Sequence, residues 1–442
     1  MDNSNRAMVF EAVTQYGYAL EFASDALKKD RVVVLAAVML CGPALKFASE
    51  ELKGDKGVVL TAVKSSGRAL QFASKKLQRD REVVLAAVEK TGASLEYASK
   101  VLQMDREVVL AAVKKAGAAL EFASDVNKND REVVLAALEE NGLALKFASE
   151  ELREDREVVL VAVKESRGVA MEYASATLKE DREFILDAVK QGSEALAHAP
   201  EALQDDREVV MAAVKQCGYA LLYASKKLQT DRDVVLVAIQ ICSCALCYAS
   251  EEIKKDRVVV MAAVMQNGTA LEYASEEFKE DGEVVLAAVK QNGQALQFVS
   301  EDFKKNREMV LTAVKTWGYA VHVCAKEFTM DREVALAAVK QDGTALYFVS
   351  EELKDDPEVV LAAVKKYGTA LQNASENLQA DPYLLGWARL TPLGHRNRRL
   401  RNAFLAKFGE RNAKVQAQVD RWLIQNNLTN YISAKRQRVS HC

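Results

Sequence analysis

A pattern of apolar and polar positions recurs every 25 residues between residues 5 and 380. In the copy that begins at Asp105, a polar Asp-Arg-Glu is followed by the apolar run Val-Val-Leu-Ala-Ala-Val, two lysines, a turn with a glycine, and a segment of small, leucine and aromatic residues. We number fifteen such repeats, and positions within each repeat from its opening Asp or Asn. A fixed period of about 20 to 50 residues indicates a tandem repeat array.

Each repeat is predicted to begin with a helix. Position 1 is Asp in thirteen repeats and Asn in the other two (Asn5 and Asn306), and both side chains can cap the free amides of a helix N-terminus. Pro357 at position 2 of repeat 15 suits the first helical residue, where a missing amide proton matters little. Positions 4 to 9 are apolar around most of the helix circumference, so we expect this helix to be covered on several sides.

Glycine at position 13 is predicted to end the first helix in the left-handed conformation. A second, shorter helix follows, carrying Ala144, Leu145 and Phe147 in repeat 6, and Ser149 is expected to cap a last turn that buries Leu152. One such pair buries too little apolar surface to offset its loss of chain entropy, so the repeats must stack. The expected fold is all-α, a right-handed α-solenoid of about fifteen helix-turn-helix repeats with a C-terminal helical cap.

Two regions depart from the pattern. Residues 164–205 contain an extra residue at Ser166-Arg167-Gly168 and several substitutions, including His198 and Pro200, and we expect a kink there. Residues 381–442 start the register once more and then lose it, so we assign residues 1–380 to the array and 381–442 to a basic helical cap or tail. The apolar residues expected to cover the end of the array are Trp387, Leu390, Phe404, Leu405, Trp422 and Leu423.

Charge is unevenly divided, although the chain as a whole carries only −3. Residues 1–380 hold 48 Lys and Arg against 60 Asp and Glu, whereas residues 381–442 hold 12 against 3. Such asymmetry is typical of contact with nucleic acid, a membrane surface or an acidic partner. No apolar run approaches the roughly 18 residues of a membrane span, the first residues leave no room for a signal peptide, and the seven cysteines fit reduced thiols, so a cytoplasmic protein is expected.

The motif D-R-E-V-V-L-A-A-V-K-x-x-G-x-A-L-x-x-A-S, found at Asp105 and with one substitution at Asp206, resembles that of a known repeat family. The resemblance covers residues 5 to 380, and the family, a domain of unknown function, occurs in tandem arrays in intracellular bacteria, protists and algae. It implies no activity, cofactor or catalytic residue. Its occurrence in intracellular bacteria suggests a secreted effector that works inside a host cell.

Catalytic chemistry is not predicted from the sequence. The four histidines (His198, His322, His395 and His441) are scattered, and there is no nucleophile elbow, phosphate-binding glycine loop or metal-type His-x-x-x-His spacing. The recurring acids are explained as helix caps and a solvated face. We therefore expect a protein that is not an enzyme and needs no cofactor.

The cysteines of repeats 9 and 10 leave an alternative open. Cys242, Cys244 and Cys247 occupy positions 12, 14 and 17 of repeat 10, and Cys217 occupies position 12 of repeat 9. Four converging thiolates would suit zinc or an iron–sulfur cluster. Cys41 also occupies position 12 with no other cysteine near it, which favours small apolar filler over a metal site.

Positions 11, 12, 14 and 17 vary freely between repeats whose other positions barely change. Stacking would align them along one edge of the array, and their aromatic residues are the kind that interfaces favour. The alternative is unconstrained exposure to solvent. The predicted partner-binding residues are Tyr16, Tyr18, Arg68, Asn141, Tyr219, Asn267, Asn292, Trp317, Tyr319, Asp342 and Tyr367.

Lysine occupies position 10 in nine repeats, and a row of lysines at repeat spacing could follow a phosphate backbone. Against this nucleic-acid alternative, the array is acidic, and a lysine near a helix C-terminus is favoured without any ligand. The basic tail could equally be a nuclear import signal, a contact for acidic lipid or the acidic array, or a solvated cap. The residues predicted for nucleic-acid contact are Lys114, Lys164, Lys215, Lys290, Lys340, Arg398, Arg399 and Arg401.

Overall fold

The computed structural model describes residues 3–390 of the chain, which contain helices and no strand. Its contacts divide the chain into an N-terminal block, Met1–Leu228, and a C-terminal block, Gln229–Cys442, which we describe separately. In both blocks helical segments of successive repeats pack in chain order, so the predicted all-α class and the stacking of helical repeats are confirmed. The right-handed sense of the superhelix stays a prediction.

Each repeat contains three helical segments. The first segments are α1 (Asn3–Gln15), α3 (Arg31–Leu40), α5 (Lys56–Ser65), α6 (Arg81–Lys90), α8 (Arg106–Lys115), α10 (Arg131–Glu140), α12 (Arg156–Glu165), α14 (Arg182–Gln191), α16 (Arg207–Gln216), α17 (Arg232–Ile241), α18 (Arg257–Gln266), α20 (Gly282–Gln291), α22 (Arg307–Thr316), α24 (Arg332–Gln341) and α26 (Pro357–Lys366), followed by α28 (Pro382–Leu390).

The second segments are 3-10 helices, with one α-helical exception in repeat 13. They are η1 (Gly17–Phe22), η2 (Gly42–Phe47), η3 (Gly67–Phe72), η5 (Gly92–Tyr97), η6 (Gly117–Phe122), η7 (Gly142–Phe147), η8 (Val169–Tyr173), η9 (Ser193–His198), η10 (Gly218–Tyr223), η12 (Ser243–Tyr248), η14 (Gly268–Tyr273), η15 (Gly293–Gln297), α23 (Ala320–Val323), η17 (Gly343–Phe348) and η18 (Gly368–Asn373).

The third segments are single turns that lead into the next repeat. They are α2 (Asp25–Lys28), α4 (Glu50–Lys53), η4 (Leu77–Arg79), α7 (Lys100–Met104), α9 (Asp125–Lys128), α11 (Glu150–Glu154), α13 (Ala176–Glu180), α15 (Glu201–Gln204), η11 (Leu228–Thr230), η13 (Ile253–Lys255), α19 (Glu276–Lys279), α21 (Glu301–Lys304), η16 (Lys326–Thr329), α25 (Glu351–Lys354) and α27 (Glu376–Gln379).

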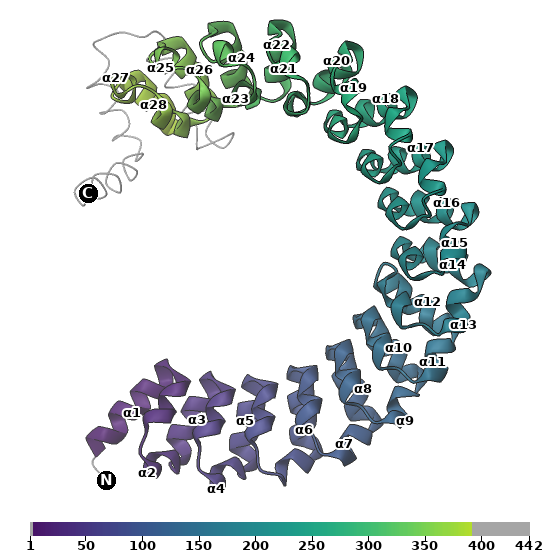
Figure 1. Cartoon of the computed structure of the whole chain (residues 1–442). Coiled ribbons are helices and arrows are strands. Elements are labelled where there is room, and N and C mark those ends of the chain that lie inside the picture. Colours follow the sequence, from purple (N-terminus) through teal and green to yellow (C-terminus); the bar gives the residue numbers. More distant parts are fainter. Residues whose placement is uncertain (1–2, 391–442) are drawn as a thin grey trace. The chain divides into compact units, whose positions relative to one another are not determined.

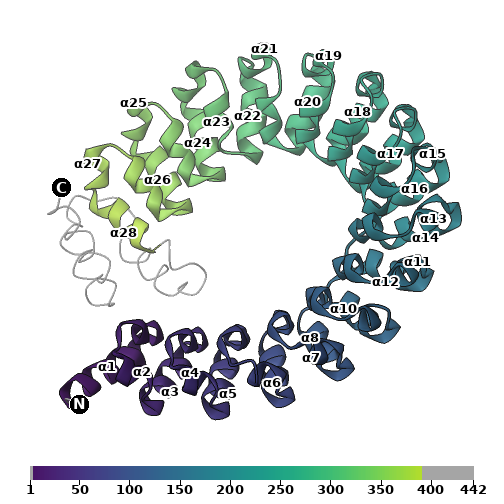
Figure 2. The same ribbon diagram turned by 60° about the horizontal axis from the view of Figure 1, so that its bottom comes forward.

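Within each block the first helices lie side by side, and the second segments form a parallel row (Figures 1 and 2). In the N-terminal block α3, α5, α6, α8 and α10 contact one another in this order, and so do η1, η2, η3, η5, η6 and η7. In the C-terminal block the same holds for α18, α20, α22, α24 and α26. A side chain at a given position therefore lies next to its counterparts in the neighbouring repeats.

The first helices begin as predicted in the repeats that open with Asp. The Asp105 carboxylate accepts hydrogen bonds from the amides of Glu107 (3.0 Å) and Val108 (3.2 Å). Asn306 caps α22 in the same way, accepting from Met309 at 3.1 Å. The prediction for Asn5 is wrong: α1 begins at Asn3, so Asn5 lies inside the helix and does not precede it.

The apolar run is buried on one side and half-buried on the other. In α8 the residues at positions 4, 5, 8 and 9 are fully buried (Val108, Val109, Ala112 and Val113). Leu110 and Ala111 at positions 6 and 7 are half-buried instead. The expectation of cover on several sides is therefore correct for four of the six positions, and the other two line the surface.

The left-handed glycine predicted at position 13 is wrong for the repeats that keep the 25-residue period, and correct for the displaced Gly168 of repeat 7. Among residues 3–390, left-handed φ angles occur only at Arg167 (59°) and Gly168 (114°). The glycine is required by close approach, because a Cβ on Gly117 would lie 2.2 Å from the carbonyl oxygen of Ala137 in the next repeat. The second segment begins at this glycine and packs directly on the C-terminal end of the neighbouring first helix. In repeat 10 the buried Ser243 takes its place.

The predicted serine cap is confirmed. Ser149 Oγ accepts a hydrogen bond from the Leu152 amide at 3.3 Å, and Leu152 is buried. The Ser149 amide donates to the carbonyl of Lys128 in the preceding repeat at 2.9 Å. This bond recurs between neighbouring repeats, for instance from Ser350 to Thr329, so the third segments bind the array together through the backbone.

Charged side chains at positions 1, 2 and 3 form a second connection, which we call the ion-pair ladder. Arg106 at position 2 of repeat 5 donates to Asp130 (2.7 Å) and pairs with Glu132, at positions 1 and 3 of repeat 6. Lys56 does the same toward Asp80 and Glu82, at 2.8 Å each. The pairing recurs through both blocks with Arg81, Arg131, Arg182, Arg257, Arg307 and Arg332.

The ladder holds its position-1 carboxylates ionised. The hydrogen bond from Arg106 lowers the pKa of Asp130 below its ordinary value, and amide bonds from Val133 and Glu132 act in the same direction against partial burial. The Arg106 side chain is 45% exposed, so a single pair contributes little and the effect lies in the repetition.

The extra residue in repeat 7 is absorbed in one turn. Arg167 and Gly168 adopt their left-handed angles there, and the Gly168 amide donates to the Val163 carbonyl at 2.8 Å. On both sides of this turn the helices keep their neighbours, since α12 contacts α14 and α14 contacts α16. The kink expected over residues 164–205 stays a prediction.

The described chain ends in one further first helix. Asp381 caps α28 by accepting from the amides of Tyr383 (2.9 Å) and Leu384 (3.1 Å), and α28 packs on α26 and η18. Trp387 is buried, as expected of a residue that covers the end of the array. Leu390 is the last residue of α28, and the other predicted cap residues, Phe404, Leu405, Trp422 and Leu423, lie outside the described residues.

Candidate functional site

The 3-10 geometry of the second segment decides which side chains reach the surface. This helix has three residues per turn, so residues three apart share a face. In repeat 5 Gly117, Leu120 and Ala123, at positions 13, 16 and 19, form one buried face, and Ala119 at position 15 is buried as well. Ala118 and Glu121, at positions 14 and 17, form an exposed face. Positions 14 and 17 are therefore aligned in the repeats whose second segment is a 3-10 helix.

An aromatic ring at position 18 connects these faces between neighbouring repeats. The Tyr18 ring in repeat 1 meets the Phe47 ring in repeat 2 edge to face, with centroids 6.1 Å apart. In repeats 3 and 4, burial raises the pKa of the Tyr97 hydroxyl and the nearby Arg68 opposes that rise. The ring at position 18 thus lies beside position 14 of the preceding repeat. We call positions 12, 14, 17 and 18 together the variable edge.

Position 18 is not among the edge residues predicted from the sequence, because the aromatic ring there is assigned to the packing of the second helix. Its rings are half-buried, as at Phe72, Phe122 and Tyr173, so each keeps part of one face at the surface. The spacing of the small and apolar residues could have indicated this. Glycine, leucine and alanine recur at positions 13, 16 and 19 with a period of three, and position 18 does not belong to that set.

The densest part of the variable edge is an aromatic cluster in repeats 13 and 14. The Trp317 and Tyr319 rings are stacked with centroids 6.3 Å apart, and the Phe348 ring lies 5.3 Å from Tyr319. The centroid of the His322 ring lies 4.5 Å from that of Phe348, and the centroid of the Tyr347 ring lies 5.1 Å from it. The cluster thus brings together two of the predicted residues and three that the prediction did not include.

Hydrogen bonds fix the predicted residues Tyr319 and Asp342 to each other through Thr344. The Tyr319 hydroxyl lies 2.6 Å from Thr344 Oγ1, and the Thr344 hydroxyl donates to the Asp342 carboxylate at 2.6 Å. Because the threonine proton is directed to Asp342, Tyr319 is the donor to Thr344. Hydrogen bonds within the chain therefore hold this part of the cluster in place.

Four of the predicted residues at position 12 also serve the fold. Their side-chain oxygens accept a hydrogen bond from the amide two residues later and so cap the second segment, in Asn141 (3.0 Å), Asn267 (3.1 Å), Asn292 (2.9 Å) and Asp342 (2.9 Å). A short side chain bonded to its own backbone is typical of Asn and Asp at turns. These residues lie on the edge with one acceptor atom already engaged.

Side chains at position 11 fasten neighbouring repeats. Gln291, Thr316 and Gln341 accept from the amide of the position-13 glycine in the preceding repeat, at 2.6, 2.8 and 2.7 Å. Ser65 accepts from Gly42 at 3.2 Å. Position 11 varies because several hydrogen-bonding side chains can reach the same amide, and it is left out of the variable edge for this reason.

The remaining predicted residues are exposed on the edge. Tyr16 and Tyr18 in repeat 1 are 75% and 51% exposed. Tyr219 and Tyr367 are 45% and 46% exposed, and Arg68 is also exposed. Tyr16 and Tyr18 share repeat 1, and Arg68, Tyr219 and Tyr367 lie in three other repeats of the two blocks, so these residues are spread along the array.

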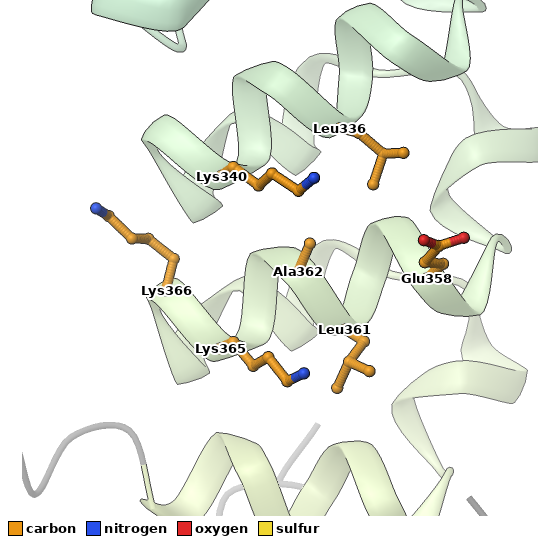
Figure 3. A pocket seen from close by; sticks show the side chains of 7 residues that line it. All are labelled: Leu336, Lys340, Glu358, Leu361, Ala362, Lys365 and Lys366. Carbon is orange, nitrogen blue, oxygen red and sulfur yellow. The ribbon is translucent and has the colours of Figure 1, made fainter. Parts of the chain in front are cut away.

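A different face carries grooves between neighbouring first helices. In the C-terminal block, a groove of about 380 Å³ at α24 and α26 is lined by Leu336, Leu361 and Ala362 and by Lys340 and Lys365. Figure 3 shows Leu336 and Ala362 facing each other between the two helices, and Leu361 and Lys365 on the other side of α26. In the N-terminal block, Leu186 and Met211 form the floor of a groove between α14 and α16. The floor residues are the half-buried ones at positions 6 and 7.

The lysines predicted for nucleic-acid contact lie on this second face. Lys114, Lys164, Lys215, Lys290 and Lys340 are all exposed at the C-terminal ends of their first helices. These lysines are separate from the variable edge, because position 10 lies on the first helix, before the turn that leads to the second segment. Arg398, Arg399 and Arg401 lie outside the described residues.

The cysteines of the alternative metal site are free thiols. Cys242, Cys244 and Cys247 are half-buried, and burial raises the pKa of the Cys247 thiol. Cys217 belongs to the N-terminal block and the other three to the C-terminal block. Within residues 3–390 no group of three or more His, Cys, Asp or Glu side chains is arranged to hold a metal ion.

The two described histidines lie on the edge at positions 17 and 18. Burial lowers the pKa of His198, which takes the place of the aromatic ring in repeat 8. His322 contacts Phe348 in the aromatic cluster.

In the part of the chain that the structure covers, no helix is long and apolar enough to cross a membrane.

The profile of one protein family, described as a domain of unknown function (DUF4116), matches this chain in nine segments: 5–53, 33–78, 55–103, 80–126, 130–179, 181–229, 231–279, 281–329 and 331–379. The chain belongs to this family. A match such as 5–53 spans two of the 25-residue repeats, and together the matches cover the array predicted from the motif. No curated protein matches the DUF4116 chain.

Proposed function

We propose that this DUF4116 array is a non-catalytic scaffold that binds a protein partner along the variable edge. The aromatic cluster of Trp317, Tyr319, His322, Tyr347 and Phe348 supports the proposal most, since it offers clustered rings, held by hydrogen bonds, at the surface. Protein interfaces favour such rigid aromatic side chains as anchors. The edge lies on segments whose buried faces hardly vary, so its residues can change without loss of the stack.

Alanine replacement of Tyr16, Tyr219, Trp317 and Tyr319 tests the proposal. We expect capture of partners from cytosol, followed by mass spectrometry, to fall while helical circular dichroism is unchanged. Val126→Ala with Val258→Ala is the matched control, because these side chains are 72% and 57% exposed away from the edge. Unchanged capture by the aromatic variant, or equal loss in the control, would contradict the proposal.

We also propose that the partner is a cytoplasmic protein, and that the array acts inside a host cell as a secreted effector. The occurrence of similar arrays in intracellular bacteria supports this. The same capture experiment compares host and bacterial cytosol, and partners found only in the bacterial cytosol would speak against an effector.

A further inference from the structure

The groove between α24 and α26 belongs to a row of similar surfaces in repeats 12 to 15. Position 10 is lysine in four consecutive first helices of the C-terminal block: Lys290, Lys315, Lys340 and Lys365. Half-buried leucines lie one turn earlier, at Leu286, Leu311, Leu336 and Leu361. Because α20, α22, α24 and α26 contact one another in order, lysines and leucines form two parallel rows. We call this surface the lysine–leucine face.

The positive charge on this face is not compensated. Glu358 lines the groove, but its carboxylate is already paired with Arg332 in the ion-pair ladder. Lys340 and Lys366 have no carboxylate partner among the described residues, and Lys365 lies over the Trp387 ring at 5.1 Å. In the N-terminal block Lys164 and Lys190 are paired with Glu165 (3.5 Å) and Asp187 (3.3 Å), whereas Lys64, Lys114 and Lys215 have no carboxylate partner among the described residues.

The leucine row distinguishes between possible ligands. Figure 3 shows Leu336 pointing from α24 toward α26, with Ala362 opposite it and Lys340 in the same gap, whereas Leu361 and Lys365 project from the other side of α26. A nucleic-acid backbone would set hydrated phosphates against these apolar side chains and leave them without a partner. A peptide can offer carboxylates to the lysines and apolar side chains to the leucines.

The repeat spacing restricts the conformation of such a peptide. Packed helices lie about 8–10 Å apart, and an extended polyproline-type chain rises about 3.1 Å per residue. About three residues of the peptide would therefore span one repeat. We propose that the lysine–leucine face binds an extended acidic segment of a partner protein, with a carboxylate and a large apolar side chain recurring near every third residue.

A labelled synthetic peptide of four Glu-Pro-Leu units is the probe, measured by fluorescence anisotropy with the full chain. Binding should weaken as salt is raised, since exposed charges are screened. Reversal of Lys290, Lys315, Lys340 and Lys365 to Glu should weaken binding by about tenfold or more. The control variant Lys164→Glu with Lys190→Glu makes the same kind of charge change in the N-terminal block and should leave binding unchanged.

Three further comparisons decide the proposal. A peptide with serine in place of leucine should bind more weakly, and the aromatic variant with Trp317→Ala and Tyr319→Ala should bind the original peptide normally, which separates this face from the variable edge. The proposal is overturned if the peptide does not bind, if the serine peptide binds equally well, if the lysine reversal has no effect, or if single-stranded RNA or DNA of similar length binds more tightly.

Discussion

The two ends of the first helix differ in what neighbouring repeats require of them. At its N-terminal end the ion-pair ladder repeats the same Asp, Arg and Glu, because each side chain bonds a partner in the adjacent repeat. Beyond its C-terminal end, positions 12, 14 and 17 differ from repeat to repeat, and their side chains point to the surface of the second segment. The constant ladder thus bonds one repeat to the next, and positions 12, 14 and 17 vary on the surface, whereas position 11 varies although it also bonds the preceding repeat.

Repeats 12 and 13 support this comparison from within the chain. Position 2 of repeat 12 is Gly282, which offers no cation, and position 1 of repeat 13 is Asn306, which offers no carboxylate. Asn306 nevertheless keeps its bond to the Met309 amide. The cap is therefore needed in a repeat where the ion pair is not, which separates the two roles of the position-1 residue.

The largest effect is expected from a constant position between the two ends. A Cβ on Gly268 would lie 2.1 Å from the carbonyl oxygen of Ala288, so Gly268→Ala must push repeats 11 and 12 apart. We expect a loss of about 2–3 kcal/mol of unfolding free energy, as in other overpacked cores, measured by urea denaturation.

Gly282→Ala is the matched control in the same block. The nearest atoms to its Cβ would be those of the Phe303 ring at 3.6 Å and 3.8 Å, and the residue is helical. This change should stabilise the chain by about 0.5–1 kcal/mol, because alanine favours the helix. Equal effects of the two substitutions would show that close approach is not what the position-13 glycine is for.

The same glycine shows how far sequence reasoning reached. The period, the Asp caps, the Ser149 cap and the stacking of repeats follow from local rules that each repeat obeys on its own. The reason for Gly117 lies in the next repeat, where the Ala137 carbonyl approaches it, and no local rule reports that contact. The ion-pair ladder was missed for the same reason, since Arg106 finds its partners 24 and 26 residues later.

The candidate site was predicted only in part. Variation between repeats singled out Tyr18, Trp317 and Tyr319, whose rings do contact others on the variable edge. Variation alone could not separate them from Asn292, whose side chain caps its own segment, or from Gln291, which bonds the preceding repeat. The rings at position 18 hardly vary, so a search for variable positions passed over them.

A smaller effect should separate two residues of the variable edge that share position 12. Asn292→Ala removes the bond to the Gln294 amide (2.9 Å) and should lower the unfolding free energy by about 0.5–1 kcal/mol, as for other lost caps. Tyr367→Ala removes a side chain that is 46% exposed and should change stability by less than about 0.5 kcal/mol. Urea denaturation measures both, and partner capture should show the reverse order. A larger loss of stability in the tyrosine variant would mean that the edge is part of the core.

The smallest effect is expected when a ladder carboxylate loses its charge but keeps its role as a helix cap. Asp130→Asn keeps an oxygen for the amides of Glu132 and Val133 and removes the charge that faces Arg106. Arg106 lowers the pKa of Asp130 in the folded chain below its value in the unfolded chain, which is about 3.9. The ion pair therefore stabilises the fold at pH values above this unfolded pKa. This contribution is lost as the pH falls through the folded pKa.

At neutral pH the natural chain should therefore be more stable than the Asp130→Asn variant by no more than about 0.5 kcal/mol, since the pair is partly exposed. The difference should begin to shrink as the pH falls below about 4, where Asp130 of the unfolded chain becomes protonated, and should vanish below the lower pKa that Asp130 has in the folded chain. Asn306→Asp is the opposite control: Gly282 supplies no cation, so the added charge should bring no gain at neutral pH. Denaturant titrations at several pH values measure both differences. A difference that persists in acid would assign the role of Asp130 to its cap alone, and the ladder would then contribute nothing to holding the repeats together.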